Sequence, residues 1–234
     1  MTILVTGGAG VLGGVVVRQL EDAGRAVRSA SRRTGVDLLT GDGLAAAMAD
    51  VDVVIHCATT LGGKDIRLTE NLIAAANGAH IVYISIVGID RVPLPYYKTK
   101  RAAERLIQDS GLPWTILRTT QFHQLLARLW SVQRLPVVFV PALRFQPVDT
   151  ETVASRLIEL AAGPPAGRVD DLGGPKIEKA RDLARTYLRV RGSRRPTVPL
   201  WIPGKTFAAY RRGGHLTPDH AVGRVDFDTF LSQP

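Results

Sequence analysis

The chain has 234 residues, of which 45% are hydrophobic, and this is enough to fill one sizeable core, so a single domain over residues 1–234 is expected. No run approaches the roughly 20 apolar residues of a membrane helix, and no signal-peptide pattern precedes the first strand-like segment, which predicts a cytoplasmic protein without a membrane partner. The single cysteine excludes an intramolecular disulfide and argues against a cysteine-based metal site, so no metal is expected. The net charge of +9 suits an anionic ligand or a solvated basic surface, but the densest arginine clusters lack the interleaved aromatic residues that single-stranded nucleic acids require.

Strand-length apolar runs alternate with amphipathic stretches as far as residue 118, which is typical of an α/β protein with a parallel sheet covered by helices on both faces. Strands are predicted near 3–6, 26–30, 37–40, 52–56, 80–85 and 114–118. Helices are predicted near 11–23, 43–49, 65–77, 96–110, 122–134 and 150–162.

The last third of the chain is broken by proline and glycine into short pieces, with one good helix near 176–191. In open α/β sheets, ligands lie beyond the carboxyl ends of the strands, where irregular segments can close over a substrate. We therefore expect residues 1–120 to form the nucleotide-binding half and residues 121–234 to supply a small substrate-side cap and the last sheet elements.

A glycine-rich loop joins the first strand to the first helix. Gly7, Gly10 and Gly13 have the spacing of a dinucleotide-binding loop in a strand, loop and helix context, which predicts a Rossmann-type doubly wound sheet. Gly7 permits a tight turn, Gly10 lets the backbone approach a pyrophosphate, and Gly13 allows the helix to pack closely. Val11 and Leu12 belong to the helical turn whose N–H groups would bind the phosphates.

The end of the second strand indicates which dinucleotide is preferred. NAD sites place a carboxylate there for the adenosine ribose, but this chain has Ser31, Arg32 and Arg33. A hydroxyl and two guanidinium groups suit a ribose phosphate, so NADP(H) is favoured over NAD(H). The alternatives are a solvated charge pair and a single arginine that stacks on adenine, which would also fit NAD.

Two further segments are assigned to the cofactor site. Asp42, followed by Gly43, is expected to cap the next helix, to accept from the adenine amino group, or to do both. Cys57, Ala58 and Thr59 end the next strand beside the glycine loop, so their backbone is expected to line the cofactor. The thiol of Cys57 is interpreted as inert packing rather than as a nucleophile.

These features resemble the atypical short-chain dehydrogenase/reductase superfamily, specifically its NmrA-like branch of NAD(P)-binding proteins. The resemblance covers essentially the whole chain. Its marks are the three loop glycines and the stretches at 81–88, 96–100, 111–118, 148–154, 171–175 and 214–218, with 230–231 near the end.

The resemblance assigns chemistry to Tyr96 and Lys100, whose spacing of four places both on one helix face. In active members of the superfamily the tyrosine is the general acid or base, while the lysine holds the nicotinamide ribose and lowers the pKa of the tyrosine. A nearby ammonium group favours the phenolate, so the physical chemistry agrees with this role. In the alternative, Tyr96 packs and only Lys100 touches the cofactor.

The chain departs from the superfamily at the serine that usually joins this pair. The strand ends in Ser85 and Ile86, so an aliphatic side chain occupies the position where the family often has its second serine. Ser85 is assigned to the cofactor site, where its hydroxyl is expected to bond locally to backbone, and Ile86 is assigned to the substrate pocket. Loss of one oxyanion donor lowers rates by roughly 10²- to 10³-fold, which puts fast alcohol dehydrogenation in doubt.

The segment after the sixth strand corresponds to the part of the family that faces the nicotinamide. The resemblance assigns Thr119 to the cofactor and Gln121, Phe122 and His123 to the substrate pocket. Gln121 and His123 are placed to orient a polar substrate or supply a proton, and the alternative is a helix start with His123 partly solvated.

The leading hypothesis is an NADP-dependent oxidoreductase that passes a hydride to a small apolar or aromatic carbonyl or quinone. The first alternative is a non-catalytic NmrA-like redox sensor of the nucleotide. The second is a tailoring enzyme that acts on a polycyclic aromatic metabolite. The expected partner is a small-molecule substrate, and the sequence leaves the oligomeric state open.

Overall fold

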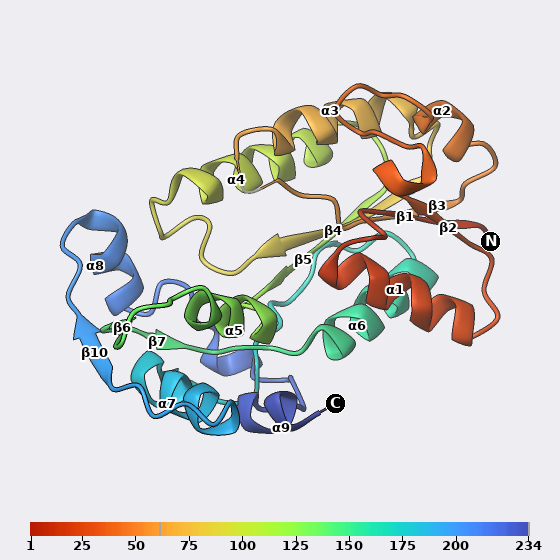
Figure 1. The fold of residues 1–234 in the computed structure, drawn as a ribbon. Coiled ribbons are helices and arrows are strands. Elements are labelled where there is room, and N and C mark those ends of the chain that lie inside the picture. Colours follow the sequence, from red (N-terminus) through yellow and green to blue (C-terminus); the bar gives the residue numbers. More distant parts are fainter. Residues whose placement is uncertain (61, 234) are drawn as a thin grey trace. The chain divides into compact units, whose positions relative to one another are not determined.

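A computed structural model describes residues 1–60 and 62–233 of the chain (Figure 1). The chain forms two compact units whose segments interleave along the sequence. The first, called the sheet unit below, comprises Met1–Ile86, Leu94–Arg118 and Thr150–Asp170. The second unit comprises Val87–Pro93, Thr119–Asp149 and Asp171–Pro234.

The sheet unit is built on a six-stranded Rossmann-like parallel sheet in the order β2-β1-β3-β4-β5-β8. Its strands are β1 (Ile3–Thr6), β2 (Val27–Ala30), β3 (Val53–His56), β4 (His80–Ile86), β5 (Trp114–Thr119) and β8 (Gly167–Arg168). Thr6 at the end of β1 is in register with Ala30 on one side and His56 on the other. The strand order reverses about β1, and ligands of such sheets bind in the crevice at this switch point.

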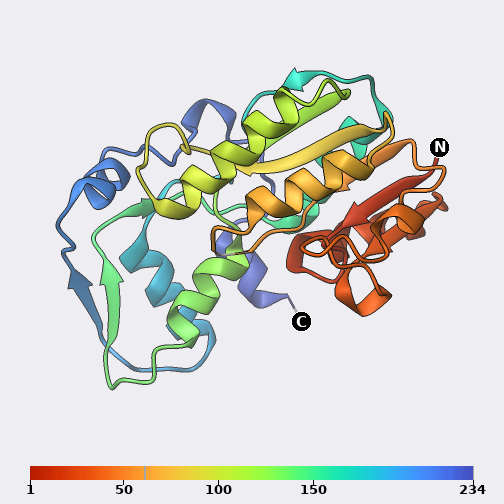
Figure 2. The same ribbon diagram turned by 90° about the horizontal axis from the view of Figure 1, so that it is seen from above.

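Helices cover both faces of this sheet (Figure 1). On one face, α1 (Val11–Asp22) packs against α6 (Thr150–Ala162). On the other, α3 (Asp65–Ala75) and α4 (Pro95–Gln108) lie side by side, as Figure 2 shows, with α2 (Leu44–Ala47) next to α3. This arrangement confirms the α/β fold expected from the sequence.

The predicted strand at 37–40 is wrong, because that segment is a turn. The carboxylate of Asp37 accepts from the Leu39 N–H at 2.8 Å, and the Asp37 carbonyl accepts from the Gly41 N–H at 2.8 Å. These local bonds occupy the groups that a sheet neighbour would need. Val36 and Leu38 are buried in the core, so their alternation reflects packing rather than strand pairing.

The second unit contains two small sheets. β6 (Val138–Pro141) pairs in parallel with β10 (Thr197–Leu200), seen as neighbouring arrows in Figure 2, and β7 (Arg144–Phe145) pairs antiparallel with β9 (Glu178–Lys179). Its helices are α5 (His123–Ser131), α7 (Ala180–Val190), α8 (Lys205–Arg211) and α9 (Phe227–Ser232). The helix predicted near 176–191 is therefore present as α7. Among the described residues, no helix is both long and apolar enough to cross a membrane.

Candidate functional site

The glycine loop between β1 and α1 has a backbone that requires glycine at two positions. Gly7 has φ +68°, and a Cβ there would lie 2.8 Å from Cα of Ala58. A Cβ on Gly13 would lie 2.2 Å from the carbonyl oxygen of Gly7. Any larger residue at either position would push the loop away from β3 or from the start of α1.

The start of α1 suits a dinucleotide pyrophosphate. Gly10 is the N-cap, no side chain caps the helix, and its first turn contains no acidic residue. The first N–H groups of a helix have no partner within the helix, and they carry the positive end of its dipole. The turn that includes Val11 and Leu12 therefore fits the phosphates predicted for it.

The end of β2 lies directly beside this loop. The Gly7 N–H donates to the Ala30 carbonyl at 2.9 Å, which fixes the loop against the strand that leads into Ser31. Ser31 and Thr34 form a capping box around the short 3-10 helix Arg32–Thr34. Arg32 and Arg33 are exposed at its start, and no ion pair engages either of them within the described part of the chain. Two exposed arginines thus follow closely on the strand end that is bonded to the glycine loop.

The prediction that Asp42 caps a helix is wrong. Gly43 is the N-cap of α2, with φ +69°, and no side chain caps that helix. The carboxylate of Asp42 instead accepts from the Thr40 hydroxyl at 2.7 Å and stays exposed. Recognition of adenine by Asp42 and Gly43 stays a prediction.

The segment at the end of β3 packs against the glycine loop. The Ala58 N–H donates to the Thr6 hydroxyl at 3.3 Å, and its Cα is the atom that excludes a side chain at Gly7. Burial raises the pKa of the Cys57 thiol to about 12, so this sulfur is protonated at neutral pH. This agrees with the interpretation of Cys57 as inert packing.

A chain of three side chains links Tyr96 to a buried carboxylate. Thr59 Oγ1 lies 2.6 Å from Asp65 Oδ2 and 2.8 Å from Tyr96 Oη. An ionised carboxylate only accepts, so the single hydroxyl proton of Thr59 is donated to Asp65. Tyr96 must then be the donor to Thr59. Thr59 directly follows Ala58, which contacts Gly7. These hydrogen bonds therefore place the Tyr96 hydroxyl near the strand end that packs against the glycine loop.

Asp65 was missed as a site residue. It is 1% exposed, and its second oxygen accepts from the N–H and the hydroxyl of Thr60 at 2.6 and 2.8 Å. The signal available in the sequence was a pair of threonines at a strand end, followed closely by an aspartate at a helix start.

Lys100 lies on α4 with Tyr96, as predicted, but makes different contacts from those expected. It is 3% exposed, its Nζ donates to the Ile84 carbonyl at 3.0 Å, and it lies 4.2 Å from the centroid of the Tyr83 ring. Burial lowers the pKa of Lys100 to about 8. The pKa of Tyr96 is raised by burial, with a further rise from the Asp65 charge, so the expected lowering by Lys100 is not found.

The hydroxyl of Ser85 does not bond locally to backbone, contrary to expectation. Ser85 is 2% exposed, and its Oγ has no hydrogen-bond partner among the residues that the structure describes. Ile86, the last residue of β4, is half-buried and offers no hydroxyl. A buried polar atom without a partner is uncommon, and it marks the end of β4 as a place where a ligand could complete the bonding.

The remaining predicted residues belong to the second unit. The Thr119 carbonyl accepts from the Val87 N–H at 2.9 Å, and Phe122 is the N-cap of α5. Both side-chain amide atoms of Gln121 are buried and lack a partner within the described residues, so its capacity to bind a polar group is unused. The structure thus provides a polar group at Gln121, as predicted, and its role toward a substrate stays a prediction.

His123 begins α5, but the alternative in which it is partly solvated is wrong. His123 is fully buried, its Nε2 contacts the Val225 carbonyl at 3.0 Å, and its ring stacks on Phe230 with 5.0 Å between centroids. Burial lowers the pKa of His123, so the imidazole is held neutral and is a poor proton donor.

Comparison with known proteins agrees with this geometry. Residues 7–125 match the model of a family described as NAD(P)H-binding. A (4-alkanoyl-5-oxo-2,5-dihydrofuran-3-yl)methyl phosphate reductase of Streptomyces griseus subsp. griseus is 29% identical over 210 residues, which cover 81% of this chain and 74% of the relative. The photosystem II assembly factor Ycf39 of a Synechocystis species is 29% identical over 53% of this chain, which spans about half (46%) of that relative.

A solved structure shares the fold. The NADPH-dependent quinone oxidoreductase QOR2 of Escherichia coli, complexed with NADPH, superimposes with a TM-score of 0.76 at 17% identity and 99% coverage of both chains. The glycine loop, the uncapped α1 and the family match agree with one another. The chain therefore belongs to the NAD(P)H-binding family.

Proposed function

We propose that this protein is an NADPH-dependent reductase of a small apolar or aromatic carbonyl compound or quinone, with Tyr96 as the proton donor. The observation that carries the proposal is the chain from Tyr96 through Thr59 to Asp65, which fixes the tyrosine hydroxyl near the strand end that packs against the glycine loop. The Streptomyces relative supports a carbonyl substrate, because its name is that of a reductase whose substrate bears alkanoyl and oxo groups beside a methyl phosphate.

The nucleotide, when bound, supplies the hydride, and the protein's residues supply position and a proton. A raised pKa keeps Tyr96 protonated at neutral pH, which is the form that a reduction needs. The Tyr96 hydroxyl turns its proton from Thr59 to the carbonyl oxygen as the carbonyl carbon accepts the hydride, and the Thr59 hydroxyl turns its own proton from Asp65 to the Tyr96 phenolate. The product is an alcohol, which in the case of a quinone tautomerises to the hydroquinone. Thr59 and Asp65 act as positioning residues.

The direct test is a screen of quinones, aromatic ketones and enones for loss of NADPH absorbance with the purified protein. Turnover of at least one class, lost in a Tyr96→Phe variant, is the expected result. A protein that binds NADPH but turns over no member of a broad panel would contradict the proposal.

The preference for NADPH is tested at the end of β2. We expect Arg32→Glu to weaken NADPH binding by roughly 10- to 100-fold, because hydrogen bonds between charged groups contribute about 1.5–3 kcal/mol. NADH, which lacks the ribose phosphate, should lose much less. Both dissociation constants are measured by calorimetry at one salt concentration.

The control for this prediction is Arg25→Glu, which reverses an exposed charge just before β2 and changes the net charge equally. It should alter the two dissociation constants by similar small factors. Equal losses for NADPH and NADH in Arg32→Glu would remove the argument for phosphate recognition.

The affinity for NADPH should depend on pH through Lys100. Below its pKa of about 8 the ammonium group is present to bind the nicotinamide ribose, and above it the charge is lost. We therefore expect the dissociation constant to rise by at most about tenfold per pH unit between pH 8 and 9.5. Fluorescence titrations from pH 7 to 9.5 measure this change, with the cofactor phosphate already almost fully ionised.

Lys100→Met should bind NADPH more weakly and without this pH dependence, whereas Lys98→Met, an exposed position on the same helix, should keep it. An unchanged dissociation constant for the unaltered protein across the whole range would show that the Lys100 ammonium group does not hold the cofactor.

A non-catalytic nucleotide sensor is the second candidate function, and the aliphatic side chain of Ile86 favours it. The relative Ycf39 supports this candidate, because its name gives an assembly role and no reaction. A sensor must bind NADP and NADPH with different affinities in order to shift an equilibrium. Calorimetry with both forms tests this candidate, and equal affinities would exclude the sensor.

A further inference from the structure

The basic charge of the protein is concentrated in the second unit. Its segments contain sixteen Lys and Arg residues against eight Asp and Glu, a net charge of +8 of the total +9. The sheet unit, which holds the glycine loop, is therefore almost neutral. A strongly basic unit attracts anions, and the structure contains a concave site where that attraction is focused.

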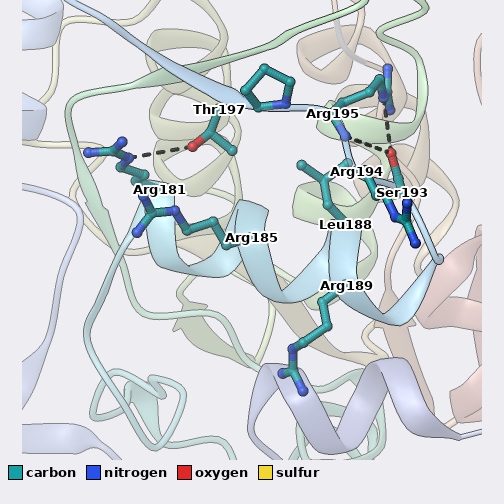
Figure 3. Close-up of a pocket in the computed structure, with 9 residues that line it drawn as sticks. Arg181, Arg185, Leu188, Arg189, Ser193, Arg194, Arg195 and Thr197 are labelled. Carbon is teal, nitrogen blue, oxygen red and sulfur yellow. Dashed lines mark hydrogen bonds between the residues drawn. The ribbon is translucent and has the colours of Figure 1, made fainter.

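That site is a cavity of about 300 Å³ beside α7, with nine lining residues (Figure 3). We call it the arginine pocket. Five of the nine residues are arginines, two carry hydroxyls and two are apolar, and none is acidic: Arg181, Arg185, Leu188, Arg189, Ser193, Arg194, Arg195, Pro196 and Thr197.

The arrangement follows from the sequence of α7 and of the loop after it. Arg181, Arg185 and Arg189 are spaced by four residues and lie on the exposed side of the helix, while Leu183 and Tyr187 belong to the core. At 1.5 Å per residue, successive arginines are about 6 Å apart, and the row extends for about 12 Å. The chain then returns past the helix end, which adds the arginines at 194 and 195 from the loop (Figure 3).

Few carboxylates neutralise this row. Asp228 lies 2.8 Å from Arg189, and Asp182 lies 4.0 Å from Arg185. For Arg181, Arg194 and Arg195, no ion pair is found in the described part of the chain. Like charges four residues apart on a helix repel one another, so a bound anion would relieve this repulsion.

Two of these side chains are already held in place. Arg195 donates to the Gln133 and Leu135 carbonyls and, through Nε, to the Ser193 hydroxyl at 3.3 Å. Arg181 Nε donates to the Thr197 hydroxyl at 3.4 Å, a bond drawn in Figure 3. Fixed guanidinium groups lose less side-chain entropy when they bind a ligand than free ones do.

We propose that the arginine pocket binds a small ligand with two or more linked phosphate groups, at a site that uses none of the residues assigned to the dinucleotide. Guanidinium groups bind phosphate in a bidentate manner, and a row of about 12 Å exceeds the span of one phosphate. The lining favours a small oligophosphate over a nucleic acid, since it offers no aromatic ring on which a base could stack.

The experiment is a calorimetric titration with inorganic tripolyphosphate, pyrophosphate and phosphate, each at the same ionic strength and with saturating NADPH present. We expect tripolyphosphate to bind most tightly, phosphate most weakly, and the affinity to fall as salt rises. The double variant Arg181→Gln, Arg185→Gln should bind tripolyphosphate at least tenfold more weakly. Tripolyphosphate should also raise the melting temperature of the unaltered protein, and not that of this variant.

The matched control is Arg25→Gln, Arg105→Gln, which removes the same charge from two exposed positions of the sheet unit. This control should bind tripolyphosphate with an affinity within about twofold of that of the unaltered protein. Equal losses in both double variants would mean a general charge effect and would overturn the proposal. So would tripolyphosphate binding that appears only without NADPH, because the ligand would then be in the dinucleotide site.

Two other outcomes would also overturn it: no binding of any oligophosphate, and binding only to vesicles that contain an anionic phospholipid. None of these measurements uses turnover. The proposal of an oligophosphate site can therefore be wrong while the proposed reductase function is right, and the reverse also holds.

Discussion

Tyr96→Phe is expected to lower kcat for NADPH-dependent reduction by roughly 10²- to 10⁴-fold, the usual contribution of a positioned general acid. The variant loses only the hydroxyl that donates to Thr59 at 2.8 Å, and the ring keeps its place on α4. The dissociation constant of NADPH should change by less than about twofold. A loss of kcat without loss of cofactor affinity separates proton donation from binding.

The companion variants test whether Thr59 and Asp65 position this hydroxyl. Thr59→Val removes the acceptor and should lower kcat, while Thr59→Ser keeps the hydroxyl and should restore most of it. Asp65→Asn removes a charge that raises the pKa of Tyr96, so that pKa should fall. Reduction needs protonated Tyr96 and is lost as pH rises through its pKa, so the alkaline limb of kcat should move to lower pH in Asp65→Asn.

This pH profile is measured at saturating NADPH, so that the titration of Lys100 affects kcat little. A merely structural role for Asp65 would lower kcat equally at every pH and leave the limb in place. Full activity of Tyr96→Phe would show that another group donates the proton.

The glycine loop was predictable because its requirements are local. A positive φ at Gly7 and the contact between Gly13 and the loop backbone depend on a few residues of one strand, turn and helix. The position of Arg32 and Arg33 just after the end of β2 was predictable for the same reason. The turn at 37–40 was not, since Val36 and Leu38 alternate in the manner of a strand and only the Asp37 bonds show otherwise.

The chemistry around Tyr96 depends on contacts distant in sequence, and here prediction was weaker. Spacing placed Tyr96 and Lys100 on one helix but could not show that Lys100 turns to the Ile84 carbonyl and the Tyr83 ring. It also could not show that Thr59, 37 residues away, accepts from Tyr96. The full burial of His123 was missed for the same reason, because its aromatic neighbours come from α9, about a hundred residues later.

The small strands of the second unit illustrate the same limit. β7 and β9 are two residues long, and Arg144–Phe145 is a strand only because Glu178–Lys179 pairs with it. Neither segment has enough residues to reveal an alternating pattern. Such elements are set by the tertiary fold rather than by local propensity.

Arg118→Met is expected to destabilise the protein by about 3–5 kcal/mol, the usual result of removing one partner from a buried ion pair. Arg118 and Glu104 form a two-bond contact within the sheet unit, with Nε–Oε1 at 2.8 Å and Nη2–Oε2 at 2.6 Å. Both residues are almost fully buried, so the variant would leave the Glu104 carboxylate desolvated and unpaired. Urea denaturation followed by circular dichroism measures the change in the free energy of unfolding.

The matched control is Arg156→Met, which breaks an exposed contact of 2.7 Å with Glu159 and should change stability by less than about 1 kcal/mol. The double variant Arg118→Met, Glu104→Leu removes both charges and should recover most of the lost stability, because no buried carboxylate then lacks a partner. If the double variant were as unstable as the single one, the loss would lie in packing around β5. A loss below 1 kcal/mol in Arg118→Met would mean that water reaches Glu104 once the guanidinium group is gone.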